Sequence, residues 1–392
     1  MSEFDKIKAL DDENVAHTYG RFPVAIKEGK GATCYDFDGK KYIDFSSGIG
    51  VNSLGFCDKG WVKAVTEQLN TLQHISNLYY TEPCARAAKL LCKKTGMKKV
   101  FFSNSGAESN EGAIKCARKY SLTKYGENRN KVITLVNSFH GRTVTTLAAT
   151  GQDVFHKYFF PFTEGFAFAP ANDFEKLVGI ADDSTCAIMM ELIQGEGGVM
   201  PLENDFVKKV EAFCKEKDIL LIIDEVQTGV GRTGKLFAFQ NYGISPDIVT
   251  TAKGIGGGLP LGCVMFGEKT ECTFGPSDHA TTFGGNPVAT AGAVHILERL
   301  DDGFLSEVKA KGEYITEKLL KMPHVIGVDG MGMMLGIRLE EGIVAADIVK
   351  KAIANGALAL TAKTKLRLLP PLTITYEEID EGLSAIEKAL SE

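Results

Sequence analysis

The chain has 392 residues, of which 44% are hydrophobic and 24% charged, and its formal net charge at pH 7 is −6. This length exceeds what one hydrophobic core usually serves, so we expect two lobes. The acidic balance offers no positive footprint for nucleic acid. No stretch of about 18 apolar residues could span a membrane, and residues 1–6 lack the apolar region of a signal peptide. These properties predict a cytoplasmic protein with small-molecule partners.

Helices and strands alternate along most of the chain. After a polar N-terminal arm, residues 32–45 alternate in polarity around Asp38-Gly39, which predicts a β-hairpin. Then come helices at 61–72, 83–94 and 204–217, interspersed with apolar strands at 100–102, 132–136, 187–191 and 219–223. Helices near 287–300 and 304–321, a strand-rich stretch around 325–339 and an α/β segment complete the chain. This alternation predicts an α/β fold with a mainly parallel central sheet flanked by helices.

Nine cysteines are scattered through apolar or helical segments, and no two have the C-x-x-C spacing. An odd, unpatterned set is typical of reduced thiols in a reducing compartment, rather than of a disulfide framework or a zinc site. We therefore predict no metal site.

Two charged residues have distinctive surroundings. Asp224 ends the apolar run 219–223, and Lys253 stands alone before the glycine-rich loop 254–258. Open α/β sheets bind ligands at the carboxyl ends of their strands, and a glycine loop allows close approach of the backbone. A buried acid and an isolated lysine are the groups that pyridoxal 5'-phosphate requires, for its pyridinium nitrogen and its Schiff base. Each alone is more simply a helix cap or a solvated loop lysine, so the assignment depends on further motifs.

Ser105 and Gly106 form a turn between a short strand and an amphipathic helix. Such a turn offers free backbone N–H groups and the positive end of the helix dipole, which together bind an anion such as a cofactor phosphate. The alternative is an ordinary capping box, with Ser105 at the N-cap and Glu108 three residues later. Taken alone, the motif favours the capping box.

Other motifs also follow predicted strands. Phe139 could stack on a pyridine ring, and Arg142 offers a planar fork for a carboxylate, although in isolation they resemble a core residue and a surface charge. Glu191 and Glu196 follow another apolar strand, and residues 281–286 place hydroxyls in a Gly/Asn/Pro turn. The order and context of these motifs are more informative than any one of them.

A second enzyme class must also be weighed. Residues Gly229 to Lys235 match the P-loop pattern G-x-x-x-x-G-K after a strand, which suggests a nucleotide hydrolase. However, Leu236 replaces the Ser or Thr that binds Mg²⁺, and residues 225–229 separate Asp224 from the glycine loop without entering a helix pattern. A third hypothesis is a non-catalytic regulator that retains the cofactor site; the candidate substrate arginines Arg142 and Arg367 argue against it.

The motifs are Ser105-Gly-Ala-Glu-Ser-Asn-Glu, Phe139-His-Gly-Arg, Gln194-Gly-Glu-Gly-Gly, Asp224-Glu-Val-Gln-Thr-Gly-Val-Gly-Arg-Thr-Gly, Ala252-Lys-Gly and Thr281-Thr-Phe-Gly-Gly-Asn-Pro. Together they resemble the class III pyridoxal-phosphate aminotransferases, from about residue 18 to the C-terminus. The resemblance implies a type I aminotransferase-like fold. It also implies an N-terminal arm and part of a small domain at 1–60, a large cofactor-binding domain at 61–285 and the C-terminal small domain at 286–392.

The resemblance further implies residue roles. Lys253 links covalently to pyridoxal 5'-phosphate, and Asp224 pairs with the pyridine nitrogen. The other implied cofactor contacts are Ser105, Gly106, Ala107 and Thr282 at the phosphate, Phe139 and Val226 on the two ring faces, and Glu225 and Gln227 beside the ring. Thr282 is contributed by the partner subunit of a homodimer.

For substrates, the resemblance implies that Arg142 binds a carboxylate and that Thr281 lies beside an acylated amino acid. Arg367 takes the α-carboxylate of glutamate, and Glu196 is its resting ion-pair partner. The implied reaction transfers the δ-amino group of N-acetylornithine to 2-oxoglutarate, in arginine biosynthesis. Ornithine, succinylornithine, succinyl-diaminopimelate and 4-aminobutyrate are alternative donors.

The chain departs from the family pattern in two segments. Leu54-Gly-Phe-Cys-Asp-Lys replaces Leu-Gly-His-x-His-Pro, and Glu191-Leu-Ile-Gln replaces Glu-Pro-Ile-Gln. Neither change affects an implied cofactor residue. The first lies near the expected substrate entrance and therefore bears on the identity of the acyl donor.

Overall fold

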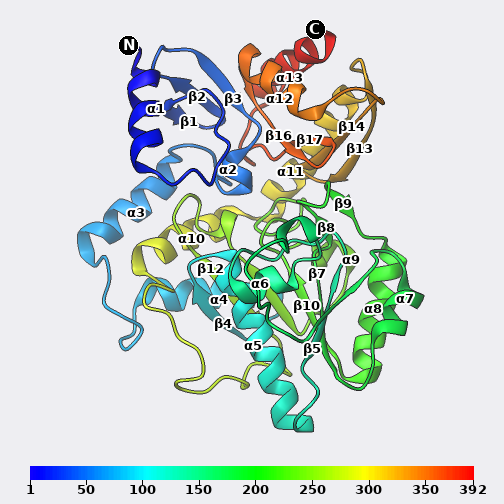
Figure 1. The fold of residues 1–392 in the computed structure, drawn as a ribbon. Helices are drawn as coiled ribbons and strands as arrows, with labels where there is room; N and C mark the ends of the chain where they lie inside the picture. The colour runs from blue at the N-terminus through cyan, green and yellow to red at the C-terminus, as the bar shows by residue number, and fades with distance from the viewer.

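A seven-stranded sheet forms the centre of the large lobe (Figure 1). Its strand order is β4 (Lys99–Ser103), β12 (Gly262–Phe266), β11 (Ile248–Thr251), β10 (Leu220–Asp224), β7 (Thr185–Met190), β5 (Lys131–Leu135) and β6 (Phe166–Ala169). The structure is a computed structural model that describes residues 1–392.

This sheet is mainly parallel, as predicted. Parallel pairs join β10 to β11 and β7, and join β5 to β6 and β7. The exception is β12, which runs antiparallel to both of its neighbours, β11 and β4. Because β12 is the only reversed strand, the other six strands all have their carboxyl ends at one edge of the sheet.

Helices cover both faces of the sheet, so β7 and β10 are buried along their whole length. Alternate residues of a strand point to opposite faces. In β10, Leu220 and Ile222 belong to the core cluster that includes α5 (Gly106–Tyr125). Leu221 and Ile223 instead belong to the larger cluster that includes α8 (Asn204–Lys217). Packing on both faces fixes the strand ends at which the candidate residues lie.

The small lobe combines both ends of the chain, which lie on the same side of the molecule (Figure 1). One sheet has the order β1 (Ile26–Lys30), β2 (Thr33–Asp36), β3 (Lys41–Asp44) and β15 (Ala357–Leu358). A second has the order β13 (Val325–Met331), β14 (Met334–Leu339), β17 (Lys365–Leu368) and β16 (Leu360–Ala362). The antiparallel pair of β2 and β3 confirms the predicted hairpin. Because β3 also pairs with β15, both ends of the chain complete one sheet.

The predicted helices are present with small shifts at their ends. They are α3 (Lys59–Thr71), α4 (Glu82–Thr95), α10 (Pro287–Arg299), α11 (Asp302–Leu319) and α8, whose bounds are those predicted. α10 packs against α3 and α4, whereas α11 packs against β13 and β14.

The remaining elements are short segments and peripheral helices. They are α1 (Glu3–Asn14), α2 (Ser47–Gly50), α6 (Val144–Ala149), α7 (Phe174–Ile180), α9 (Phe239–Tyr242), α12 (Ala345–Asn355), α13 (Tyr376–Ser391), the strands β8 (Ile193–Gln194) and β9 (Met200–Pro201), and 3-10 turns at Asp153–Phe155 and Lys253–Ile255. None of the helices combines the length and apolar character needed to cross a membrane.

Candidate active site

A cavity of about 440 Å³ opens at the edge where the parallel strands end. The segments that follow β4, β5, β7, β10 and β11 all contribute to its lining. The sheet therefore brings together residues that are far apart in the sequence. The expected site residues in the lining are Ser105, Gly106, Ala107, Phe139, Arg142, Asp224, Val226, Gln227 and Lys253. This location follows the general rule for ligands of open α/β sheets.

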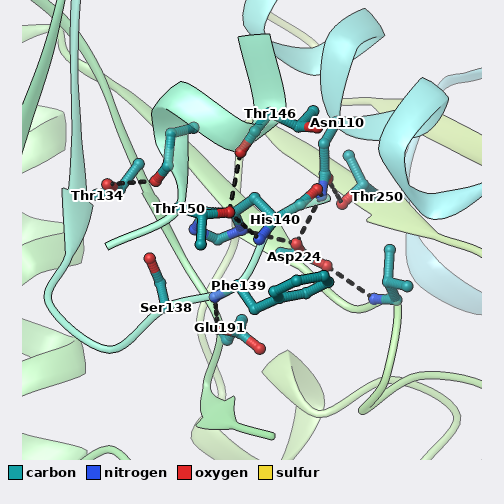
Figure 2. A network of polar contacts seen from close by, with 12 residues as sticks. Asn110, Thr134, Ser138, Phe139, His140, Thr146, Thr150, Glu191, Asp224 and Thr250 are labelled. Atoms are coloured by element: carbon teal, nitrogen blue, oxygen red, sulfur yellow. Dashed lines mark hydrogen bonds and ion pairs between the residues drawn. The ribbon is translucent and has the colours of Figure 1, made fainter. Parts of the chain in front are cut away.

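Asp224 ends β10 and is only 3% exposed. Figure 2 shows its carboxyl group between Asn110 and His140. Its Oδ2 accepts hydrogen bonds from Nδ1 of His140 at 2.8 Å and from Nδ2 of Asn110 at 2.7 Å. Its Oδ1 accepts from the backbone N–H of Val226 at 3.0 Å. These three hydrogen bonds satisfy both oxygens of a buried polar group that would otherwise be costly to bury. Asp224 therefore presents a carboxyl group to the cavity in a fixed orientation.

Lys253 follows β11 and begins a 3-10 turn with a φ of 47°, a left-handed conformation that is uncommon for a residue with a side chain. Burial lowers the pKa of its amine, and the negative charge of Glu196 only partly opposes this effect. A lysine with a lowered pKa has a larger fraction of neutral amine, which can act as a nucleophile or accept a proton. Lys253 thus has the chemistry expected of a Schiff-base lysine.

The start of α5 borders the cavity at Ser105 and Gly106. Ser105 is the N-cap, and its Oγ accepts from the backbone N–H of Glu108 at 3.2 Å. Glu108 Oε2 accepts from the backbone N–H of Asn104 at 2.5 Å, so only half of the predicted capping box forms. A Cβ at position 106 would lie 2.7 Å from the Val226 side chain, which explains the glycine. The first turn of α5 therefore offers free N–H groups to an anion in the cavity.

Arg142 lies at the exposed rim of the cavity, against two aromatic rings. Its guanidinium carbon is 4.2 Å from the ring centroid of Phe155 and 5.5 Å from that of Phe139. The two rings also pack edge to face, with centroids 5.8 Å apart. Cation–π contacts of this kind orient a guanidinium without neutralising it. The positive charge of Arg142 is therefore available to a negatively charged substrate group.

Glu191 is a second buried carboxyl in the lining. Its Oε2 accepts from the backbone N–H of Phe139 at 2.9 Å, and its Oε1 accepts from that of Gly195 at 3.4 Å. Burial, together with the nearby charge of Asp224, raises the pKa of Glu191 well above its usual value. The two backbone hydrogen bonds oppose this rise, but burial is the larger effect.

Arg367, on β17 of the small lobe, is not in the cavity lining, but it contacts Gln227, which is. Its Nη1 donates to Oε1 of Glu196 at 2.6 Å and to Oε1 of Gln227 at 3.4 Å. The side chain of Arg367 is 4% exposed, whereas that of Glu196 is 32% exposed. Burial acts to raise the pKa of Glu196, but the charge and hydrogen bond of Arg367 hold this pKa below its usual value. The ion pair that the resemblance implies is thus formed between the lobes.

Five expected site residues lie outside the cavity lining: Glu196 and Arg367, which form the ion pair described above, and Glu225, Thr281 and Thr282. The side chain of Glu225 is fully buried, and its Oε1 accepts a hydrogen bond from the backbone N–H of Phe239 at 2.7 Å. Thr281 Oγ1 accepts from Nδ2 of Asn104 at 3.0 Å. Thr282 is exposed. Within one chain, therefore, neither the two threonines nor the Glu225 side chain lines the cavity.

Two other segments also lie away from the cavity. The loop from Gly229 to Leu236 is not followed directly by a helix, because α9 begins at Phe239 and has only four residues. The P-loop hypothesis is therefore wrong. Phe56, in the segment that departs from the family pattern, packs against Gly29, and neither it nor residues 57–58 line the cavity. This departure does not change the lining.

Two residues of the site region received no role from the sequence. Asn110 lies in the lining one turn into α5, and Phe155 lies beneath Arg142. A polar residue on the apolar face of a helix was a signal that could have singled out Asn110. Phe155 lies in a segment without a recognisable motif, and only the structure brings it to Arg142.

The groups around the cavity fit pyridoxal 5'-phosphate. Lys253 offers an amine of lowered pKa, and Asp224 offers a buried carboxyl group. The first turn of α5 can accept a phosphate, and Phe139 and Val226 supply apolar surfaces for an aromatic ring. Val226, beside the expected ring position, lies close to Gly106, beside the expected phosphate position, so the two positions are adjacent in the cavity.

Comparisons with known proteins agree with this chemistry. The family model for class-III aminotransferases matches residues 14–390. The chain is 52% identical to the acetylornithine aminotransferase of Haemophilus ducreyi over 99% of both chains. An N-acetylornithine aminotransferase structure from Stenotrophomonas maltophilia has a TM-score of 0.85 and 34% identity, with 98% of both chains covered.

A second solved structure is that of the ornithine aminotransferase from Toxoplasma gondii, in which pyridoxal phosphate partly occupies the active site. It has a TM-score of 0.94 and 31% identity, and the match covers 99% of this chain and 94% of that one. The chain described here therefore belongs to the class-III aminotransferases, and its cofactor is pyridoxal 5'-phosphate.

Proposed function

We propose that this aminotransferase transfers the δ-amino group of N-acetylornithine to 2-oxoglutarate, giving N-acetylglutamate semialdehyde and glutamate. The observation that carries the proposal is the contrast between its two arginines. Arg142 has aromatic neighbours and an available charge, whereas Arg367 is paired with Glu196. Two such arginines suit an enzyme that alternates between a monocarboxylate donor and a dicarboxylate acceptor. The 52% identity to an acetylornithine aminotransferase supports the same donor.

The surroundings of Arg142 favour an acylated donor over free ornithine. The α-carboxylate of either donor can pair with the guanidinium. In free ornithine, however, a positively charged α-ammonium would come close to Arg142, and the neighbouring Phe139 and Phe155 offer no charge to balance it. Acetylation removes that ammonium charge. The acetyl group can instead lie against these aromatic rings.

The proposed chemistry assigns Lys253 two tasks. It holds the cofactor between turnovers, and after the donor amine displaces it, its Nζ removes the proton from the donor carbon that bears the amine. Pyridoxal phosphate, when bound, supplies an electron sink for the negative charge that develops on that carbon. Asp224 supports the sink by keeping its negative charge beside the ring nitrogen. Ser105, Gly106 and Ala107 bind the phosphate.

The ion pair of Arg367 with Glu196 allows the site to accept first the donor and then 2-oxoglutarate. While the donor is bound, Glu196 neutralises Arg367, which avoids an unpaired buried guanidinium. When 2-oxoglutarate binds, its α-carboxylate replaces Glu196 at Arg367, and Arg142 takes the distal carboxylate. Gln227, which contacts both members of the pair, keeps the region polar during the exchange.

We further propose a cytoplasmic homodimer that serves arginine biosynthesis. Thr282 would complete the phosphate site of the partner subunit, and Thr281 would lie near the acyl group. The exposure of Thr282 and Phe283, together with the exposed Leu78 and Tyr80, is consistent with an intersubunit surface. A sedimentation measurement tests the dimer, and a weaker cofactor affinity in Thr282→Ala tests the shared site.

A donor panel tests the proposed substrate. N-acetylornithine, ornithine, succinylornithine, succinyl-diaminopimelate and 4-aminobutyrate are each supplied with 2-oxoglutarate, and kcat/KM is compared. We expect the acylated ornithines to exceed ornithine by at least about tenfold, which corresponds to about 1.4 kcal/mol of transition-state binding. An equal or higher kcat/KM for ornithine would overturn the donor assignment but not the aminotransferase family.

A further inference from the structure

Asn110 connects α5 to the carboxyl group of Asp224. It is 1% exposed, and its side-chain amide makes three contacts (Figure 2). Nδ2 donates to Oδ2 of Asp224 and to the backbone carbonyl of His140, both at 2.7 Å. Oδ1 accepts from Oγ1 of Thr250, also at 2.7 Å. Every polar group of this buried amide therefore has a partner.

The acceptors determine which way the amide faces. A carboxylate and a backbone carbonyl can only accept hydrogen bonds, so the NH₂ group of Asn110 must face Asp224 and His140. The remaining amide oxygen must then face Thr250, whose hydroxyl donates to it. Thr250 is fully buried on β11, next to β10, so it keeps the amide from rotating.

The two carboxyl oxygens of Asp224 have different hydrogen-bond partners. Oδ2 is engaged by Asn110 and by Nδ1 of His140, while Oδ1 contacts only the backbone N–H of Val226. Because the carboxylate accepts, His140 carries its proton on Nδ1; its buried Nε2 has no partner. The contacts on Oδ2 thus set the orientation of the carboxyl and leave Oδ1 with capacity for a ligand.

We propose that Asn110, oriented by Thr250, is a positioning residue for transamination: it holds Asp224 in the orientation in which Oδ1 can pair with the pyridine nitrogen. The inference rests on the proposed role of Asp224, and it is independent of which amino donor is used. Its consequence is that Asn110 contributes to kcat and cofactor affinity although it contacts no substrate carboxylate.

The test compares Asn110→Leu, which keeps the approximate volume but removes both N–H donors, with the wild-type holoenzyme. We expect kcat to fall by about ten- to a hundredfold, the range for losing a hydrogen bond to a charged group. KM for donor and acceptor should stay within about twofold, and the cofactor dissociation constant, measured by equilibrium dialysis, should rise. Unchanged kcat, or an effect on KM alone, would overturn the proposal.

Thr250 provides a second, milder test if Asn110→Leu folds poorly. Thr250→Val removes the hydroxyl and should lower kcat, whereas Thr250→Ser keeps it and should restore most of the activity. Thr134→Val is the matched control, because Thr134 is a fully buried threonine on β5 whose hydroxyl donates to the backbone of Ala149 at 2.8 Å. It should lower the melting temperature without lowering kcat. If Thr250→Val behaves like this control, the role is merely structural and the proposal fails.

The test also separates this inference from the proposed donor. Cofactor affinity and its dependence on Asn110 are measured without any substrate. If N-acetylornithine proves to be a poor donor, the proposed function fails while the comparison of cofactor affinities still stands. If cofactor affinity and the kcat of the best donor are the same in wild type and Asn110→Leu, the inference fails while the proposed donor can stand.

Discussion

Arg367 and Glu196 meet across the boundary between the two lobes, with Nη1 and Oε1 2.6 Å apart. Arg367 is almost fully buried, and its Nε has no hydrogen-bond partner. The two residues also act in opposite directions on Lys253, because Glu196 raises and Arg367 lowers the pKa of its amine. Separation of this pair would therefore alter both the charge at the acceptor site and the protonation of the lysine.

The first prediction follows from this pair. Arg367→Ala should slow the 2-oxoglutarate half-reaction by about thirtyfold or more, since truncating one partner of a buried charge pair costs about 2 kcal/mol or more. The donor half-reaction should change much less, because Arg367 is neutralised by Glu196 during that step. Single-turnover kinetics of each half-reaction measure the difference. Arg142→Ala is the control and should slow both halves. Equal slowing by Arg367→Ala would contradict the exchange of partners.

The second prediction concerns Lys253. Lys253→Ala should abolish transamination and remove the visible absorbance of the wild-type protein, because no other lysine lines the cavity. Absorbance spectra and turnover with the best donor are the measurements. Lys235→Ala is a suitable control, since Lys235 is exposed and lies outside the lining. Full turnover by Lys253→Ala would remove the basis for this assignment.

A third prediction concerns Asp224. Asp224→Asn keeps the shape but removes the negative charge, so we expect kcat to fall by about a hundredfold or more. The change also gives His140 and Asn110 a partner with only one acceptor oxygen, which should weaken cofactor binding. Steady-state kinetics with saturating cofactor separate the two effects. A kcat near that of the wild type would make Asp224 a structural residue.

Phe155 carries a fourth prediction. Phe155→Leu removes the ring that lies 4.2 Å from the Arg142 guanidinium. The lost cation–π contact is worth about 0.5–2 kcal/mol, so KM for the donor should rise by about two- to thirtyfold. kcat should change little, because the reacting atoms are not contacted. Phe174→Leu, in an aromatic pair with Phe213 away from the cavity, is the matched control. A fall in kcat at constant KM would contradict the proposed role of Phe155.

The fifth prediction links Glu225 to stability. Burial raises the pKa of this carboxyl to about 7 from an ordinary value of 4.5. A raised pKa means that the folded state binds the proton more tightly than the unfolded state. The associated stability is therefore present below pH 4.5 and is lost as the pH rises to about 7.

Glu225→Gln should therefore stabilise the cofactor-free protein at pH 8 by up to about 3 kcal/mol, with little gain near pH 5. Glutamine can still accept from Phe239 and can donate to Thr228, so the local contacts are kept. Urea unfolding at the two pH values measures the difference. An equal effect at both pH values would show that burial of the charge is not the cause.

The sequence predicted four of the seven strands of the central sheet, β4, β5, β7 and β10, because these are continuous apolar runs that end in polar motifs; β6, β11 and β12 were not predicted. The bounds of α8 also follow directly from the pattern between Asn204 and Lys217. Neither the presence nor the direction of β12 was predicted, since a short apolar segment such as Gly262–Phe266 has the same composition in either orientation. Strand direction depends on the connections, which local periodicity does not contain.

The site was predictable to the extent that its residues lie in recognisable motifs. Lys253, Asp224 and Ser105 lie at strand ends, where the chemistry can be inferred from residue type and position. Glu225 shares a motif with Asp224, but alternation along the backbone turns its side chain into the core. Phe155 reaches Arg142 only because the chain folds back after α6. Such contacts depend on tertiary structure rather than on local sequence.

The parallel pairing of β3 with β15 has a consequence for how the enzyme is made. Ile43 of β3 is paired with Ala357 of β15. β3 is synthesised long before β15, so this pairing can form only late in synthesis. The large lobe, with Lys253 and Asp224, is complete in sequence before Arg367 leaves the ribosome. During synthesis, the cofactor cavity can therefore form while Arg367 is still missing. The ion pair of Arg367 with Glu196 can form only after that stage.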